Sequence, residues 1–277
     1  MPIKLIRYIL PALLILTVES CSGDDPSVNA SRLRLKLTDA PSTVIKEFHA
    51  DIREISVFLT DTTGQSGEWH PLRFSGKKYD ILKLRNGRTV QIVDQYIPAG
   101  TELRQIRLKF GNESYLKTNT DSTIPLHIPP ALQDGAVIDA VKMELRLNTI
   151  SSMIIDLNAA HSVWKDANGN NYLYPAARAF PETHGGKLRG YVAPLEANPL
   201  VALIQAGDTL FATPEKETTD AQMAMFQFIG LQEGEWKVYM KAEPGSGYRD
   251  TVITTSVETG KTVEMTPKPM RLRLVTE

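Results

Sequence analysis

Cysteine is almost absent from this chain, since Cys21 is the single one among 277 residues. An intrachain disulfide is therefore excluded, and stability has to come from packed apolar cores. Charge of one sign is not in excess either, because the chain contains 31 Lys and Arg residues and 32 Asp and Glu residues. This balance gives no reason to expect a nucleic-acid partner. The length allows one large or two medium-sized domains.

The chain also lacks an apolar run long enough for a transmembrane helix, which needs about 20 residues. Its longest run covers about eleven residues, 8–18, and contains Pro11. Lys4 and Arg7 precede this run. A basic start followed by a short apolar segment is typical of a secretory signal peptide, which we predict for residues 1–20.

The junction Val18-Glu19-Ser20-Cys21 resembles a bacterial lipobox, in which a lipid is joined to the cysteine sulfur before the signal peptide is removed. Ser20 meets the requirement for a small residue, whereas Val18 and Glu19 differ from the commonest residues. A lone thiol is prone to oxidation and mispairing where disulfides form, and lipidation removes that liability. We therefore expect lipidation of Cys21. The alternative is an ordinary secretory signal with a chance cysteine.

A lipid on Cys21 would make a membrane the first partner of this protein, because several acyl chains anchor a protein stably. An aspartate directly after the cysteine, which would resemble an inner-membrane retention signal, is missing. Ser22-Gly23-Asp24-Asp25 instead resembles the acidic tether that sends some Gram-negative lipoproteins to the cell surface. We expect a lipid-anchored outer-membrane protein, exposed on the cell surface, with residues 21–30 as its tether. No cysteine would then remain for thiol catalysis or metal binding.

Alternation of apolar and charged residues is the dominant pattern of the remaining chain. Residues 32–37 place three leucines on one face and three cations on the other, and residues 141–147 alternate in the same way. A period of two is typical of a half-buried β-strand. Between 48–52 and 55–59 the alternation changes phase, which predicts a β-bulge at Arg53-Glu54. We therefore predict an all-β fold.

More strands are expected at short spacing, separated by turns that contain glycine or proline. The expected strands span residues 79–84, 90–93, 103–110, 124–128, 137–147 and 153–157. Many short strands with such turns favour antiparallel β-sandwiches.

Three motifs resemble a known family in the same order along the chain. They are Leu37-Thr-Asp-Ala-Pro41, Tyr96-Ile-Pro-Ala-Gly-Thr101 followed by Gln105-Ile-Arg-Leu108, and Ile155-Asp-Leu-Asn-Ala-Ala-His-Ser162. The resemblance is to the domain-of-unknown-function family 4382, and it covers residues 31–181. It implies an extracytoplasmic, often lipid-anchored β domain, and it transfers no catalytic residue.

Proline and paired glycines after residue 180 interrupt the strand rhythm and predict a linker at residues 182–186. The linker is so short that the two domains should touch or nearly touch. Beyond it, Lys187-Leu-Arg-Gly-Tyr-Val192, Met225-Phe-Gln-Phe-Ile-Gly-Leu231 and Glu233-Gly-Glu-Trp-Lys-Val-Tyr239 resemble a carboxypeptidase-regulatory-like or transthyretin-like β-sandwich over residues 187–277. This resemblance implies a structural or interaction unit. The expected fold class is thus all-β, with two antiparallel β-sandwich domains after a lipoprotein signal peptide.

Residues for catalysis or metal binding do not cluster in the sequence. Five histidines are scattered without the H-x-H or H-x-x-x-H spacing that aims two imidazoles at one metal. Neither a glycine-rich phosphate loop nor a G-x-S-x-G nucleophile elbow occurs. We expect no enzymatic activity, no cofactor and no metal site.

One polar stretch has ligand-like spacing, because Asp166, Asn168 and Asn170 offer oxygens at alternate positions. A calcium loop of the EF-hand type would require glycine at position 171 and an acidic residue at position 177, where the chain has Asn171 and Ala177. The simpler interpretation is a hairpin tip, with a turn at Asn168 and the glycine after it. A weak calcium site is the alternative.

Aromatic rings flank this tip and make it the candidate ligand-contact site. The rings of Trp164 and Tyr172 could stack on the apolar face of a sugar ring, next to the three polar residues of the tip. Core packing is the simpler interpretation, since Tyr172 and Tyr174 are two residues apart and share one face of a strand, and ligand contact is the alternative.

These features favour a non-enzymatic surface lipoprotein that acts as a binding, adhesion or assembly module, with a glycan or a surface protein as its partner. One alternative is a glycan-processing enzyme whose carboxylates come from separate strands and meet only in the fold. Another is a purely structural spacer that holds a partner away from the membrane.

Overall fold

The computed structural model describes residues 27–40, 45–216 and 223–275, and most of them lie in β-strands. Short 3-10 helices occur among them at η1 (Ile81–Leu84), η2 (Pro130–Leu132), η3 (Ala159–His161) and η4 (Leu195–Ala197). None of the described segments is a helix long and apolar enough to cross a membrane. The predicted all-β class is confirmed. Cys21 and the expected signal peptide lie outside the described residues.

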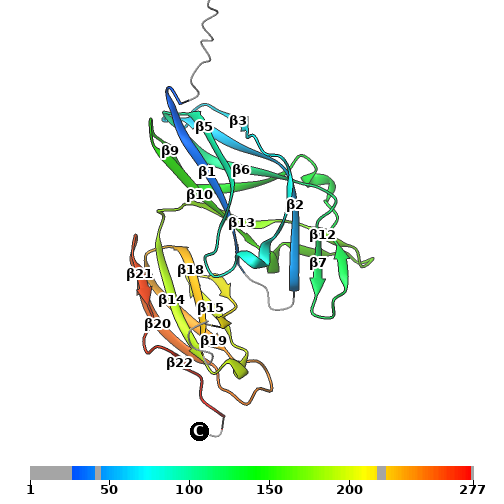
Figure 1. The fold of residues 1–277 in the computed structure, drawn as a ribbon, viewed down its shortest axis with the longest axis vertical. Helices are drawn as coiled ribbons and strands as arrows, with labels where there is room; N and C mark the ends of the chain where they lie inside the picture. The colour runs from blue at the N-terminus through cyan, green and yellow to red at the C-terminus, as the bar shows by residue number, and fades with distance from the viewer. Residues whose placement is uncertain (1–26, 41–44, 217–222, 276–277) are drawn as a thin grey trace, which may run out of the picture.

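Residues 30–181 form one large sheet with the strand order β5-β1-β10-β13-β9-β6-β2-β7-β8, and β3 and β4 also pair with β2 (Figure 1). Its strands are β1 (Ala30–Ala40), β2 (Ile45–Asp61), β3 (Gly67–Pro71), β4 (Lys77–Asp80), β5 (Val90–Pro98), β6 (Thr101–Phe110), β7 (Tyr115–Thr118), β8 (Thr123–Pro125), β9 (Ala136–Leu145), β10 (Ile150–Asn158) and β13 (Ala176–Pro181). A separate two-stranded sheet consists of β11 (Val163–Lys165) and β12 (Asn171–Leu173).

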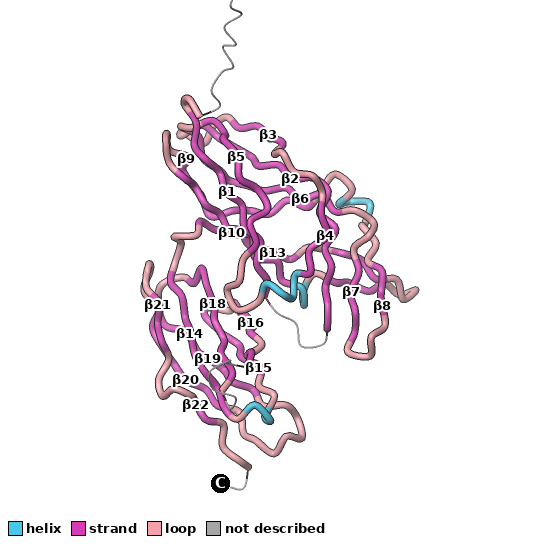
Figure 2. Tube along the Cα trace, viewed as in Figure 1, coloured by secondary structure: helices cyan, strands magenta, loops and turns pink. Residues whose placement is uncertain are grey.

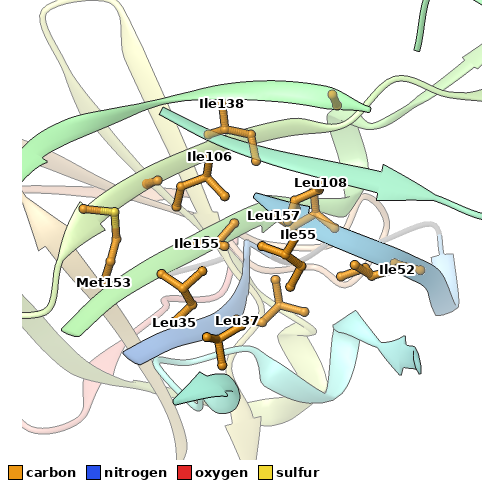
Figure 3. Packing of buried hydrophobic residues seen from close by; sticks show 14 of the residues in the cluster. Leu35, Leu37, Ile52, Ile55, Ile106, Leu108, Ile138, Met153, Ile155 and Leu157 are labelled. Carbon is orange, nitrogen blue, oxygen red and sulfur yellow. The ribbon is translucent and has the colours of Figure 1, made fainter. Parts of the chain in front are cut away.

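The large sheet folds over on itself where β13 meets β9. These strands share a single registered pair, Ala179 with Ala140, so the sheet can turn there and its two halves face each other. Figure 3 shows the core between them, where Leu37 and Ile155 from one half lie opposite Ile106 from the other. All three side chains are fully buried.

Strand β1 shows how the sequence produces this core. Leu33, Leu35 and Leu37 are fully buried, whereas the cations between them are partly exposed. One of these cations, Arg32, reaches Asp94 of the neighbouring β5 at 2.5 Å. Each buried leucine contributes roughly 1.5–3 kcal/mol relative to an exposed one, so the alternation fixes which side of the strand faces inward.

Strand β2 carries the predicted bulge. Its register with β6 shifts between Ile52 and Glu54. Ile52 and Ile55 are both buried although they are three positions apart, because the extra residue turns the next apolar side chain back to the inner face. The prediction of a bulge at Arg53-Glu54 is confirmed.

Two expected strands differ in the structure. Strand β4 stops at Asp80, and the following four residues form η1. Ile81 and Leu82 are adjacent and both buried, which the alternation of a strand does not permit. Strand β8 ends at Pro125 rather than at residue 128, because the residues after it pair with β12 instead.

Residues 186–271 form two sheets of their own (Figure 2). One has the order β17-β18-β14-β21, with β22 also paired to β14, and the other has the order β16-β15-β19-β20. Their strands are β14 (Gly186–Ala193), β15 (Leu200–Gln205), β16 (Asp208–Ala212), β17 (Glu215–Lys216), β18 (Ala224–Leu231), β19 (Gly234–Lys241), β20 (Thr251–Val257), β21 (Thr262–Glu264) and β22 (Met270–Arg271). A second core includes the fully buried Leu188, Phe226 and Val238.

The predicted β-sandwich architecture is confirmed and most of its strand pairs are antiparallel, but some neighbouring strands run parallel. Strand β1 runs parallel to β10, β13 runs parallel to β9, and β14 runs parallel to β21 and β22. The alternation along a strand depends on its two faces and not on the direction of its neighbour, so the pattern of residues could not reveal this.

Four residues, 182–185, connect β13 with β14, and the two groups of sheets meet beside them. Phe180 packs with Ile154 and Ile229 in a small buried cluster. Gly230 has a positive φ of 63°, and a Cβ atom at this position would lie 2.3 Å from the Phe180 ring. Glycine is therefore required here for both backbone conformation and close approach.

Polar contacts also cross this junction. The guanidinium of Arg178 donates hydrogen bonds to the carbonyl oxygens of Ile229 and of the glycine after it, at 2.9 and 3.1 Å. Glu215 of β17 forms ion pairs with Arg85 and Arg88. Burial alone would raise the pKa of Glu215, but the hydrogen bonds from the two arginines lower it below its ordinary value.

Candidate ligand-binding site

The hairpin of β11 and β12 carries the candidate ligand-contact residues. Its antiparallel register pairs Trp164 with Tyr172 and Val163 with Leu173. Because side chains alternate across a strand, the first pair and the second pair point to opposite sides. Leu173 is fully buried, whereas Trp164 is 53% exposed. The hairpin therefore turns its Trp164 side toward solvent.

Four rings gather on this outer side, and we call them the aromatic face: His127, Trp164, Tyr172 and Tyr174. The ring centroids of Trp164 and Tyr172 lie 5.7 Å apart, and those of Trp164 and Tyr174 lie 6.1 Å apart with the planes at 86°. The centroids of His127 and Tyr172 are separated by 5.8 Å. These are favourable distances for aromatic pairs, so the rings hold one another in place.

Core packing does not account for the aromatic face. Tyr172 and Tyr174 share one side of the strand, as their spacing predicts, but Tyr174 is 44% exposed and Tyr172 is only partly buried. The hairpin lies outside the large sheet as a two-stranded sheet of its own, so only one of its sides contacts the core. The simpler interpretation, that both tyrosines enter the core, is wrong.

Asp166 closes the tip of the hairpin. Its Oδ1 accepts hydrogen bonds from the backbone N–H groups of Asn168 and Asn170 at 2.9 and 2.7 Å. Its Oδ2 accepts one from the side-chain amide of Asn170 at 2.9 Å. This amide and the backbone N–H groups lower the pKa of Asp166 below its ordinary value. Both oxygens are thus engaged inside the turn, which favours the hairpin tip over the calcium alternative.

The structure separates the candidate residues into two groups. Trp164 and Tyr172 are in contact, whereas Asp166 holds the turn and Asn168 and Asn170 are exposed at its tip. Gly169 takes the positive φ expected of this turn, 88°.

His127 belongs to the aromatic face although no pattern in the sequence indicates it. Its backbone N–H donates to the carbonyl oxygen of Asn171 at 2.9 Å, and its carbonyl oxygen accepts from Leu173 N–H at 2.9 Å. These two bonds attach the segment after β8 to β12. A contact of this kind depends on tertiary pairing and leaves no local spacing to detect.

Two buried carboxylates meet near the junction of the two groups of sheets. Asp39 of β1 and Asp156 of the neighbouring β10 are each 6% exposed. Both oxygens of Asp39 and Oδ1 of Asp156 lack a hydrogen-bond partner, while Oδ2 of Asp156 accepts from Arg178 Nε at 2.8 Å. Burial raises the pKa of Asp39 well above its ordinary value, and the charge of Asp156 raises it further.

This carboxylate pair does not form an enzyme cleft. The cavity that Asp39 and Asp156 line has a volume of about 20 Å³, which is room for about one water molecule. Ligand pockets typically measure about 300–1,000 Å³. A sugar ring does not fit between these carboxylates, so they do not supply the paired acids of a glycan-processing enzyme.

Comparison with protein families supports the resemblance carried by the three sequence motifs. The family described as a domain of unknown function, DUF4382, matches residues 30–175. This range includes the whole aromatic face. No curated protein matches the chain.

Several solved structures match most of this chain with low similarity. A leucine-rich repeat protein from Bacteroides thetaiotaomicron VPI-5482 is 12% identical with a TM-score of 0.21, over 88% of this chain and 26% of that one. The Bacillus anthracis TIE protein is 10% identical with a TM-score of 0.23, over 89% and 34%. The fimbrial anchor protein Mfa2 from Porphyromonas gingivalis is 12% identical with a TM-score of 0.22, over 81% and 82%. The chain thus spans only 26% and 34% of the first two proteins.

Proposed function

Since this chain belongs to the DUF4382 family of domains of unknown function, we propose its function from its own residues: a lipid-anchored surface protein that binds a glycan through the aromatic face. The proposal includes no catalytic activity. The observation that carries it is a set of mutually packed rings, of which Trp164 is 53% and Tyr174 44% exposed.

Exposed tryptophan and tyrosine rings favour binding for a physical reason. Each ring offers a large, rigid contact area at a low cost in conformational entropy, and both residue types are enriched among those that dominate binding energies. The contacts of Trp164 with Tyr172 and Tyr174 already order its ring, so little freedom is lost when a ligand binds. The apolar face of a sugar ring can stack there, while the amides of Asn168 and Asn170 can bond to its hydroxyls.

Trp164→Ala is expected to weaken glycan binding by the lipid-free chain that starts at Ser22. A glycan array with the unsubstituted chain identifies the ligand, and titration calorimetry then measures its affinity. We expect a loss of about 2 kcal/mol or more, roughly 30-fold, as for a central aromatic contact. Tyr96→Ala is the matched control, because Tyr96 is 40% exposed but lies on β5. Absence of any bound glycan, or equal losses in the two variants, would contradict the proposal.

We further propose an orientation of the protein relative to the membrane. The start of β1 lies at one end of the long axis of the protein, and β22 lies toward the other end (Figure 1). A lipid on Cys21 would therefore direct residues 187–277 away from the membrane. We propose that these residues form a carboxypeptidase-regulatory-like unit after the linker at 182–186, and that 31–181 form the glycan-binding domain.

Cys21→Ser is expected to release the protein from the outer membrane of a cell that makes it. The substitution removes the sulfur to which the lipid is joined, and the chains that hold the protein to the bilayer are lost with it. Detergent-free fractionation followed by immunoblotting measures the change, with Ser22→Ala as a control that keeps the anchor. A Cys21→Ser protein that stays in the membrane fraction would refute the lipid anchor. This result would have no bearing on the glycan-binding proposal.

A further inference from the structure

A second group of polar side chains lies where β2 pairs with β4. Glu47 and His49 are two positions apart on β2 and therefore share one side of that strand. Asp80, the last residue of β4, lies opposite His49 in the antiparallel register. One potential ligand atom from each of the three residues lies within 4.8 Å of the other two. Three side chains of the kinds that bind metal ions are thus brought to one place by two strands.

The imidazole of His49 is held in position on two sides. Its Nε2 lies 2.8 Å from Oε2 of Glu47. Its ring stacks on the ring of Tyr115, with centroids 4.4 Å apart and planes at 14°. The His49 side chain is 20% exposed and that of Glu47 28% exposed, so the group is partly shielded but open to an ion from solvent.

One carboxylate oxygen of the group has no partner. Asp80 Oδ1 is buried without a hydrogen bond, and the Asp80 side chain is only 11% exposed. Lys83 Nζ lies 3.2 Å from the other oxygen, Oδ2, and Lys117 Nζ lies 3.1 Å from Glu47 Oε1. The lysines therefore leave Asp80 Oδ1 without a partner and Glu47 Oε2 in contact with the His49 nitrogen. An unpaired buried carboxylate oxygen is costly, and a cation would remove that cost.

We propose that Glu47, His49 and Asp80 bind a divalent transition metal ion, with Zn²⁺ as the ion that suits these donors. Zinc takes imidazole nitrogen and carboxylate oxygen at about 2.0–2.2 Å, and such bonds place the ligand atoms of a tetrahedral site about 3.3 Å apart. The ion replaces the proton between His49 Nε2 and Glu47 Oε2, and that proton passes to solvent. Three protein ligands leave the fourth position open to water or to a further donor.

The spacing of histidines cannot reveal such a site. Only one histidine takes part, and the third ligand comes from β4, which is separated from β2 by β3 and two loops. Glu47 and His49 alone would be a common pair of neighbours on a strand. The register of β4 against β2 adds Asp80 to them.

Glu68 and His70 provide a matched control pair within the same chain. They have the same spacing of two residues on β3, and His70 Nε2 lies 3.2 Å from Glu68 Oε1. Among the described residues, only the group with Asp80 has three such ligands together. The two pairs therefore differ in the presence of the third ligand.

Zn²⁺ added to the metal-free chain from Ser22 is expected to bind at one equivalent per chain in titration calorimetry and to raise Tm. Asp80→Asn keeps the shape of the side chain and removes its charge. Substitution of an outer-shell partner already weakens metal binding about 10- to 100-fold, so Asp80→Asn and His49→Gln should each weaken zinc binding at least about tenfold. His70→Gln should leave it unchanged.

Each outcome of this experiment either supports the zinc site or overturns it. Tenfold or greater weakening in Asp80→Asn and His49→Gln, with no change in His70→Gln, supports the site. No zinc uptake by the unsubstituted chain, or equal weakening by His70→Gln and His49→Gln, overturns it. Melting curves without metal show whether each variant folds, and if Asp80→Asn does not, the comparison of the two histidine variants decides.

Discussion

Replacing Arg178 with alanine is expected to lower the free energy of unfolding by about 3 kcal/mol, at the lower end of the range for a broken buried ion pair. Arg178 Nε donates to Asp156 Oδ2 at 2.8 Å, and the Asp156 side chain is only 7% exposed. Without the guanidinium, this carboxylate stays buried near Asp39 and loses the cation that donates a hydrogen bond to it. The Arg178 side chain is 35% exposed, so water can enter in its place and limit the loss.

The same substitution also weakens the junction between the two groups of sheets. Two donors to the backbone carbonyl oxygens of Ile229 and Gly230 disappear with the guanidinium. For domains of 150–250 residues, 1 kcal/mol corresponds to about 2–4 °C in Tm. Scanning calorimetry should therefore record a fall of roughly 6–12 °C.

Arg146→Ala is the matched control for this experiment. Arg146 also contacts a carboxylate, that of Glu144 at 2.9 Å, but its side chain is 72% exposed. Its loss should change the free energy of unfolding by less than about 0.5 kcal/mol. Adding Asp156→Asn to Arg178→Ala should restore part of the stability, because the isolated charge is removed. Similar Tm values for Arg178→Ala and Arg146→Ala would refute the argument.

Asp39→Asn is expected to stabilise the protein at neutral pH, because asparagine removes the free-energy cost of keeping an ionisable carboxyl group buried. Asp39 is 6% exposed, and neither of its oxygens has a hydrogen-bond partner. Burial and then the charge of Asp156 raise its pKa. The nearby N–H of Ala159 and the charge of Arg85 oppose the shift, and Asp80 adds to it. Asparagine keeps the shape and removes the buried ionisable group.

The raised pKa of Asp39 determines whether the stability of the protein rises or falls with pH. An unfolded aspartate has a pKa of about 3.9, whereas the pKa of Asp39 in the folded protein is raised. Between the two values the folded state holds a proton that the unfolded state has lost, so stability falls as pH rises through this window. The advantage of Asp39→Asn should therefore grow from about pH 4 toward neutral pH and vanish below pH 4.

Urea denaturation between about pH 2 and pH 8, in the presence of a chelator, measures this dependence on both sides of the ordinary aspartate pKa of about 3.9. Asp94→Asn is the control with the opposite sign, because the hydrogen bond from Arg32 lowers the pKa of Asp94. That variant should lose stability at neutral pH, and the loss should disappear as pH falls through the lowered pKa. An Asp39→Asn protein that is less stable than the unsubstituted chain at pH 7 would show that the ionised carboxylate is stabilised by its surroundings.

Strand positions were predictable because they depend on neighbours along the chain. Leu33, Leu35 and Leu37 alternate with cations, and the structure buries all three. The change of phase after Ile52 gave the bulge in β2. The failure at residues 81–84 has a local cause as well, since two adjacent apolar residues are buried together in η1.

The candidate site could be predicted only in part. The rings of Trp164 and Tyr172 and the turn at Asp166 lie within one hairpin, so their proximity follows from sequence spacing. Their exposure does not, because it depends on the hairpin standing outside the large sheet. His127 reaches the same rings from the segment after β8.

The sequence by itself determined that the chain is all-β, where its main strands run and which of their faces turn inward, because a period of two along a strand is a local property. It also carries the motifs of the family resemblance and the cysteine on which the proposal of a lipid anchor depends. Only the tertiary structure decided which distant residues meet: Asp39 beside Asp156, Asp80 beside Glu47 and His49, and Phe180 against Gly230. These contacts depend on strand order, direction and register, which are set when whole strands pack together and not by the spacing of residues along any one of them.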